Sequence, residues 1–206
     1  EDERITICMP NTPEAIATFY AVNKIGAIAS MIHPLSAENE IKYYLNLTQS
    51  KILFTVDIAW KRIKNIIKDT TVEKVIVLSV KNKMPKYMQV AYNVTKENKI
   101  EKPIYNDSII NWKTFIKNGE DYNKNTYIAR TGEDEAVVLY SGGTSGTPKG
   151  IRLSNYNFNA EAMSAFQAAN CLKPGDKVLA IMPIFHGFGL GVCVHTILSN
   201  GGQSVL

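Results

Sequence analysis

The sequence has little cysteine and no long hydrophobic run. Its 206 residues include three cysteines, which are widely separated and form no C-x-x-C pair. This spacing argues against a disulfide framework or a zinc site and favours buried thiols in a reducing compartment. No run of 18 or more apolar residues occurs, so no membrane span is predicted. The acidic first residues are unlike a signal peptide, and we expect a cytoplasmic location.

The chain also has only a small excess of positive over negative charge. The chain carries 23 Lys and Arg against 19 Asp and Glu, a net charge of +4. Residues 60–130 are more basic, with 15 Lys and Arg against 7 Asp and Glu. A basic block can bind nucleic acid. Because these lysines are scattered and no aromatic residues alternate with them, we interpret the block as a solvated surface and predict no nucleic-acid partner.

Alternating strand and helix patterns fill the first 80 residues. Short apolar runs predict strands at 5–9, 27–32, 52–56 and 75–80. Helical spacing lies between them: Thr12-Pro13 is a helix start, Gly26 a helix stop, and Ser36 a candidate N-cap. Strands separated by helices imply a parallel sheet with helices on its faces, so the predicted fold class is α/β.

After residue 80 the apolar pattern is weak at first and becomes regular again from about residue 133. Residues 81–132 are rich in Lys, Asn and Tyr, and we interpret them as a surface excursion with one helix at about 108–117. Strands are then predicted at 136–140, 151–153, 178–182 and 204–206. Helices are predicted from Ser154-Asn155 to about Cys171 and, as an amphipathic helix, at about 188–199.

A glycine-rich loop at 141–150 is the most informative segment for chemistry. It contains four glycines, four Ser or Thr hydroxyls and Lys149, between two predicted strands. Glycines allow backbone N–H groups to approach an anion, and hydroxyl and ammonium groups donate to phosphate oxygens. A Walker A loop and a dinucleotide-binding loop would each open a helix, whereas a strand follows here. The segment therefore predicts a phosphate-binding loop of another type.

The loop resembles the signature of the adenylate-forming (AMP-binding) superfamily, which reads Y-T-S-G-T-T-G-x-P-K-G-V. Tyr140 to Ile151 agrees with eight of these twelve positions, the free one included. Gly142 stands where the superfamily usually has Ser, and Asn155 where many members have His. Further segments at 9–14, 26–41 and 183–189 resemble the superfamily's x-P-N-x-x-E, G-A-x-x-x-x-x-N-P and P-x-F-H-x-x-G motifs, with His33 in place of the usual Asn.

The P-x-F-H-x-x-G motif is similar to that of acyl- and aryl-CoA synthetases. The resemblance implies a carboxylate that attacks the α-phosphate of ATP, giving acyl-AMP and pyrophosphate, and a thioester then formed with coenzyme A. It implies ATP, Mg²⁺ and coenzyme A as cofactors or co-substrates and a small-molecule carboxylate as substrate. The implied phosphate-binding residues are Ser141, Gly142, Gly143, Thr144, Ser145, Gly146, Thr147 and Lys149.

Two side chains are implied as catalytic, Lys149 and His186. Thr144 is a candidate Mg²⁺ ligand because hydroxyls can serve this ion. The implied acyl and carboxylate pocket consists of Phe185, His186, Phe188 and Gly189. Core packing is an open alternative for the aromatic residues of this set. His33 and His195 have no motif support, and we interpret both as structural.

Other functions remain open at this stage. An acyl-AMP ligase that loads a carrier protein shares these motifs, and so does a non-catalytic nucleotide-binding module. The resemblance also implies a longer parent. Residues 1–150 are expected to form a first α/β subdomain and residues 151–206 the start of a second. A C-terminal domain is expected to be absent, so the 206 residues are interpreted as an incomplete N-terminal domain with little activity alone.

Overall fold

A seven-stranded sheet forms the centre of the computed structural model, which describes residues 2–83, 86–87, 89, 101–122, 126–142 and 148–206. The strand order is β5-β4-β3-β1-β2-β6-β7. Every neighbouring pair is parallel except β6 and β7, which are antiparallel. The strands are β1 Arg4–Cys8, β2 Ile28–Met31, β3 Ile52–Val56, β4 Lys74–Leu78, β5 Ile109–Asn111, β6 Glu135–Ser141 and β7 Lys149–Ser154. The predicted α/β class with a mostly parallel sheet is confirmed.

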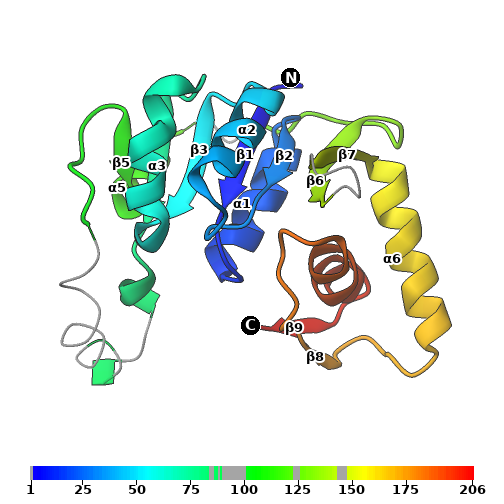
Figure 1. Cartoon of the computed structure of the whole chain (residues 1–206). Helices are drawn as coiled ribbons and strands as arrows, with labels where there is room; N and C mark the ends of the chain where they lie inside the picture. The colour runs from blue at the N-terminus through cyan, green and yellow to red at the C-terminus, as the bar shows by residue number, and fades with distance from the viewer. Residues whose placement is uncertain (1, 84–85, 88, 90–100, 123–125, 143–147) are drawn as a thin grey trace.

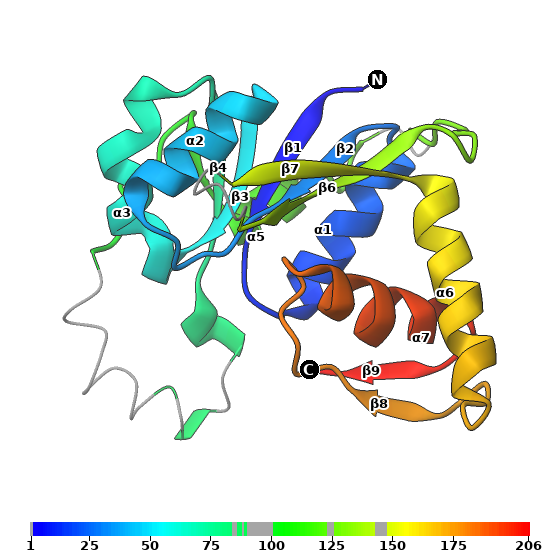
Figure 2. The same ribbon diagram turned by 45° about the vertical axis from the view of Figure 1, so that its right-hand side comes forward.

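Helices cover both faces of this sheet (Figures 1 and 2). The helices are α1 Pro13–Lys24, α2 Glu38–Thr48, α3 Trp60–Ile66 and α5 Trp112–Asn118. Helices α2 and α3 pack on one another on one face, while α1 and α5 lie on the other. The chain changes face between α1 and α2 because β2 and β3 lie on opposite sides of β1, and right-handed crossovers then require opposite faces.

Local signals in the sequence explain where the first helices begin and end. The Thr12 side chain accepts a hydrogen bond from the Ala15 N–H (3.2 Å), and Pro13 follows at the first helical position, as predicted. Gly26 ends α1 with φ +76°, a conformation that favours glycine. Helix α2 differs from the prediction: its N-cap is Ala37, because the Ser36 hydroxyl hydrogen-bonds to Glu40 instead of capping the helix.

The sheet is buried between its helix layers. The side chains of Ile7, Val56, Leu53, Val77 and Val137 are completely buried. Burial on both faces explains why these strands read as continuous apolar runs. The few buried hydroxyl groups are hydrogen-bonded, as in the pair Thr6 Oγ1 and Ser50 Oγ at 2.7 Å, because an unpaired buried hydroxyl destabilises the folded state.

The predicted helix at 108–117 is wrong at its first turn. Residues Ile109–Asn111 form strand β5, which pairs with Val75–Val77 of β4 and adds an edge strand to the sheet. Two adjacent β-branched isoleucines favour this strand. Helix α5 begins only at Trp112, where the Asn111 side chain accepts a hydrogen bond from the Lys113 N–H (2.9 Å).

The last 50 residues form a second group of elements beside α1 (Figure 1). They comprise α6 Asn155–Ala169, β8 Lys177–Leu179, a π-helix Phe188–Thr196, α7 Ile197–Ser199 and β9 Gln203–Val205. Strands β8 and β9 pair in parallel as a separate sheet. The helix predicted at 188–199 is confirmed in its position, but Phe188–Thr196 is a π-helix, and because most of its residues are buried it is not amphipathic. The strand predicted at 178–182 ends at Leu179.

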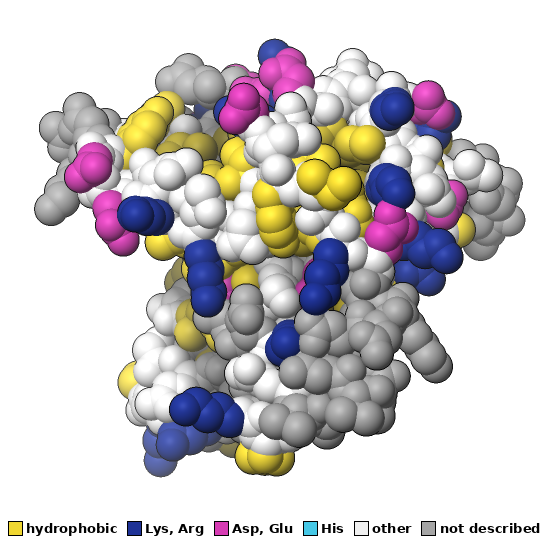
Figure 3. All heavy atoms as spheres, turned by 90° about the vertical axis from the view of Figure 1, so that its left-hand side faces the viewer, with side chains coloured by type: hydrophobic (Ala, Val, Ile, Leu, Met, Phe, Trp, Pro, Cys, Tyr) yellow, Lys and Arg dark blue, Asp and Glu magenta, His cyan; other side chains and the backbone are white. Residues whose placement is uncertain are grey.

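The side of the molecule on which α3, α5 and β5 lie in Figure 1 is shown in Figure 3. Figure 3 shows that Lys and Arg side chains on this face stand apart, with acidic, polar and hydrophobic side chains between them. Within the described ranges, no helix is both long enough and apolar enough to cross a membrane.

Candidate active site

A cavity of about 380 Å³ lies at the carboxyl ends of β2 and β6. Its walls come from four parts of the chain: the segment after β2, helix α2, the end of β6 and the segment before the π-helix. The lining residues are Met31, Ile32, His33, Leu35, Ser36, Glu40, Tyr44, Tyr140, Gly142, Phe185 and His186. The carboxyl ends of parallel strands are a common place for ligand sites in open α/β sheets.

Hydrogen bonds fix the polar side of this cavity. The Tyr44 hydroxyl donates to Glu40 Oε1 (2.7 Å), and the Tyr140 and Ser30 hydroxyls are 2.8 Å apart. The rings of Tyr44 and Tyr140 lie 3.9 Å apart between centroids. Burial acts to raise the pKa of Glu40, but hydrogen bonds from Ser36 and Tyr44 outweigh it, so the pKa is lowered. Glu40 is therefore an ionised carboxylate whose charge is compensated by its neighbours.

The Asn11 side chain holds the segment that carries His186. Its Nδ2 donates to the backbone carbonyls of Ala180 (2.9 Å) and Met182 (2.8 Å). Its Oδ1 accepts from the Ile184 N–H (2.9 Å). One amide thus forms three hydrogen bonds with the chain just before His186. Asn11 belongs to the x-P-N-x-x-E motif, from which no role for this residue was predicted.

His186 projects into the cavity from a short turn. Its N–H donates to the Pro183 carbonyl (3.0 Å), and its own carbonyl accepts from the Leu190 N–H (3.0 Å). The Nδ1 atom accepts from the Phe188 N–H (3.3 Å). This backbone donor assigns the proton of the neutral ring to Nε2.

His33 lies in the wall of the same cavity, although the sequence predicted a purely structural role. Its ring centroid is 4.3 Å from that of Phe185, the residue before His186. Its Nδ1 accepts from the Leu35 N–H (2.8 Å). The signal in the sequence was the replacement of the usual Asn at a position next to a strand end.

The predicted acyl-pocket residues separate into two pairs. Phe185 and His186 line the cavity. Phe188 is 52% exposed and Gly189 is buried, and neither is part of the cavity lining. A Cβ atom at Gly189 would lie 2.1 Å from the Pro183 carbonyl oxygen, so this glycine is required by close backbone packing. Its position supports the turn of His186, and its predicted contact with the acyl group stays a prediction.

The phosphate loop is described only at its two ends. Gly143, Thr144, Ser145, Gly146 and Thr147 lie outside the described residues, together with their predicted phosphate and Mg²⁺ contacts. Gly142 lines the cavity with His186. Lys149 pairs with Ser141 in the β6–β7 ladder, and strand alternation places both on the sheet face of Leu139. The Leu139 side chain reaches Gly187, with Cδ1 3.6 Å from the position of an added Cβ.

Lys149 also borders a second groove, of about 510 Å³, with Arg4, Thr48 and Arg152. Arg4 and Arg152 both bind Glu135 Oε2, at 3.0 Å and 2.6 Å. No group of three or more His, Cys, Asp or Glu side chains suited to a metal gathers within the described ranges. The described part of the chain therefore assigns no Mg²⁺ ligand.

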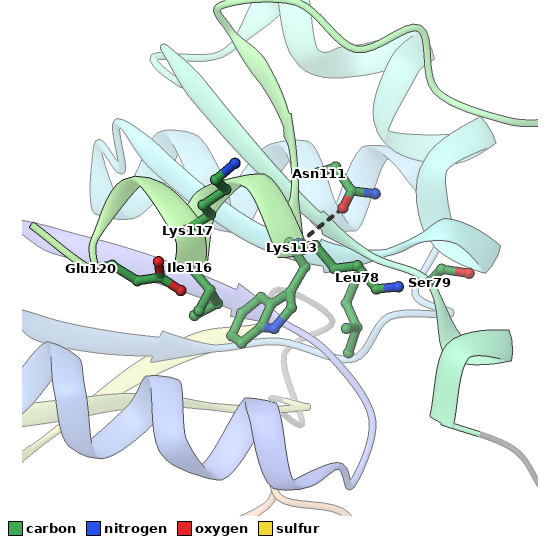
Figure 4. A pocket seen from close by; sticks show the side chains of 8 residues that line it. Leu78, Ser79, Asn111, Lys113, Ile116, Lys117 and Glu120 are labelled. Atoms are coloured by element: carbon green, nitrogen blue, oxygen red, sulfur yellow. Dashed lines mark hydrogen bonds between the residues drawn. The ribbon is translucent and has the colours of Figure 1, made fainter.

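A further cavity of about 410 Å³ lies beside α5, at the carboxyl ends of β4 and β5. Figure 4 shows its side chains in a row along the helix, with Lys113 extending toward Leu78 and Ser79 and Lys117 extending the other way. None of the predicted site residues lines it.

His195, the third histidine, lies apart from the cavity lining. Its Nδ1 is 3.1 Å from the Tyr20 hydroxyl and its Nε2 is 3.1 Å from Asn159 Oδ1. The ring stacks on Phe158 at 4.4 Å between centroids. Burial lowers the pKa of His195, as in a neutral packed imidazole. These contacts agree with the predicted structural role.

The whole of this chain, residues 1–206, matches the family model described as AMP-binding enzyme. The chain belongs to this family. It is 28% identical to the long-chain-fatty-acid–CoA ligase of Bacillus subtilis (strain 168), over 99% of the chain and 37% of the relative. It is 27% identical to "Probable 4-coumarate–CoA ligase 3" of Dictyostelium discoideum, over 97% of the chain and 35% of the relative. The chain thus spans little more than a third of these relatives.

Solved structures of similar fold cover the chain completely. The anthranilate CoA ligase AuaEII, solved in complex with anthranoyl-AMP, superposes with a TM-score of 0.77 at 19% identity. A long-chain-fatty-acid–CoA ligase from Archaeoglobus fulgidus superposes with a TM-score of 0.74 at 22% identity. In each case the chain covers 35% of the solved protein. At this level of identity the likeness shows the fold.

We predict that Gly189→Ala destabilises the protein, because its methyl group would collide with the Pro183 carbonyl. Overpacking of this kind costs about 1–3 kcal/mol in the free energy of unfolding, measured by urea denaturation. Gly187→Ala is the matched control, since its Cβ meets only Leu139 at an ordinary 3.6 Å. Equal stability of the two variants would contradict the close packing at Gly189.

We predict that Asn11→Ala and Asn11→Asp have different effects on the Ile184 amide. Asp keeps the acceptor for the Ile184 N–H but loses both donors to Ala180 and Met182. Hydrogen exchange should therefore accelerate at Ile184 in Asn11→Ala and stay slow in Asn11→Asp. Both variants should lose about 1–3 kcal/mol of stability. Unchanged exchange at Ile184 in Asn11→Ala would show that the amide does not hold this segment.

Proposed function

We propose that this chain is part of an ATP-dependent carboxylate–CoA ligase, which forms an acyl-adenylate and then a thioester. The CoA ligase names of its relatives support this reaction class. The single observation that carries the proposal is the cavity that unites Gly142 of the phosphate loop with Phe185 and His186. Two motifs far apart in the sequence thus meet at one place, as a reaction between ATP and a carboxylate requires.

The roles follow from the chemistry of the side chains. When the carboxylate attacks the α-phosphate, negative charge develops on the departing pyrophosphate. Lys149 and the Ser, Thr and backbone groups of the loop are proposed to stabilise that charge. The His186 Nε2–H is proposed to donate to the carboxylate or the acyl-adenylate. Thr144 is the proposed ligand of Mg²⁺, which when bound would supply positive charge against the negative charge that develops on the phosphates.

We also propose the domain organisation and the substrates of the longer enzyme. Residues 1–150 would form a first subdomain and residues 151–206 the start of a second, within a longer enzyme. The substrates would be a small-molecule carboxylate, ATP and coenzyme A, with a carrier protein as the alternative acceptor. Because the chain spans about 37% of its curated relatives, we propose that the 206 residues alone have little or no ligase activity.

We predict that Lys149→Ala in the complete enzyme lowers carboxylate-dependent ATP–pyrophosphate exchange by about 100-fold, because one preorganised charge at the leaving pyrophosphate is lost. The midpoint of urea denaturation should not change, since Lys149 is exposed. The control is Lys113→Ala, which changes an exposed lysine of α5 that does not line the cavity of His186. This variant should retain full exchange. Normal exchange in Lys149→Ala would remove this lysine from the phosphate site.

We predict that His186→Ala raises the KM for the carboxylate by about tenfold or more, the effect of losing one hydrogen bond to a charged group. The KM for ATP should change less than twofold. Both constants come from pyrophosphate exchange with one substrate varied at a time. His195→Ala, at a histidine packed away from the cavity, serves as the comparison for a purely structural loss. An equal rise of both KM values in His186→Ala would indicate a structural role.

A further inference from the structure

His33 and His186 share one pattern of hydrogen bonding. In each ring, Nδ1 accepts a hydrogen bond from the backbone N–H two residues further on, Leu35 for His33 (2.8 Å) and Phe188 for His186 (3.3 Å). A protonated Nδ1 would face these N–H groups and lose both bonds. The neutral tautomer that carries its proton on Nε2 therefore fits both rings.

The two Nε2–H groups are available for a ligand. Within the described residues, neither donates to a protein acceptor. Phe185 fixes the orientation of the His33 ring by packing at 4.3 Å between centroids, and the same Phe185 immediately precedes His186 in the chain. Both histidines therefore lie in the wall of one cavity, with Phe185 packed on the His33 ring.

We propose that His33 is a second binding residue for the carboxylate substrate, whose Nε2–H donates to an oxygen of the acid or of its acyl-adenylate. This assignment rests on the proposed ligase function and adds a residue to its site. Because its Nδ1 accepts from the Leu35 N–H, a neutral His33 ring carries its proton on Nε2. Its role is to donate a hydrogen bond to an oxygen of the ligand.

The ionised Glu40 carboxylate lies in the wall of the same cavity and has hydrogen-bond donors of its own. The Glu40 carboxylate accepts hydrogen bonds from the Tyr44 hydroxyl (2.7 Å), from Ser36 and from the Ala37 backbone. These hydrogen bonds, together with the electrostatic effect of His33, lower the pKa of Glu40 and keep the carboxylate ionised. The wall formed by Met31, Ile32 and Phe185 is apolar and suits the hydrocarbon part of a carboxylate.

Three substitutions separate hydrogen bonding from packing. His33→Asn keeps an N–H donor and restores the asparagine of the family motif. His33→Phe keeps an aromatic ring against Phe185 but has no donor. His33→Ala removes both. The complete enzyme is assayed by ATP–pyrophosphate exchange with palmitate and with 4-coumarate, the two kinds of acid named in its relatives.

The proposal predicts that His33→Phe and His33→Ala each raise the KM for the acid by about tenfold or more, with the KM for ATP within twofold. His33→Asn should stay within about threefold of the unmodified enzyme. Normal KM values in His33→Phe would overturn the proposal and leave His33 a packing residue. Equal rises for acid and ATP would overturn it as well. Absence of exchange from the unmodified enzyme with both acids would remove the proposed function itself, and His33 with it.

Discussion

The hydrogen bonds of the Asn11 side chain are the interaction on which the geometry of the site depends. Asn11 follows β1 in the centre of the sheet, whereas the three groups that it binds lie between β8 and the π-helix. A single amide can satisfy two carbonyls and one N–H because it carries both donors and an acceptor. This contact fixes the chain just before His186 against the carboxyl edge of the sheet. Other hydrogen bonds also join the two groups of elements, such as that between the Tyr20 hydroxyl and His195 Nδ1 (3.1 Å), whereas those of Asn11 hold the chain just before His186.

The carboxyl edge of the sheet forms the other part of the cavity wall. Strands β2 and β6 are parallel neighbours, so their carboxyl ends open on the same edge and bring His33 beside the start of the phosphate loop. The rings of Tyr44 and Tyr140 pack helix α2 against that edge, with 3.9 Å between their centroids. Each hydroxyl has a hydrogen-bond partner, Glu40 within α2 for Tyr44 and Ser30 of β2 for Tyr140.

Much of the fold was predictable because its signals are local. Thr12-Pro13 and Gly26 mark helix ends through their own backbone chemistry, and doubly buried strands read as apolar runs. The start of α5 and the π-helix were not predictable, because pairing with β4 and burial against neighbouring elements override periodicity there. In the site, the motifs identified Gly142, Phe185 and His186. The motifs also contain Asn11 and His33 but did not reveal their roles, because Asn11 acts through a contact with a distant segment and His33 differs from the family pattern.

The central claim is that a carboxylate is activated in the cavity between the phosphate loop and His186. It can be tested most directly by NMR of the histidine rings in the complete enzyme, titrated with palmitoyl- or 4-coumaroyl-sulfamoyladenosine, stable analogues of an acyl-adenylate. The account predicts that one of these analogues shifts the Nε2 resonances of His33 and His186 and leaves those of the packed His195 in place. Saturating binding of an analogue with both cavity histidines unchanged would contradict it, and so would failure of both analogues to bind.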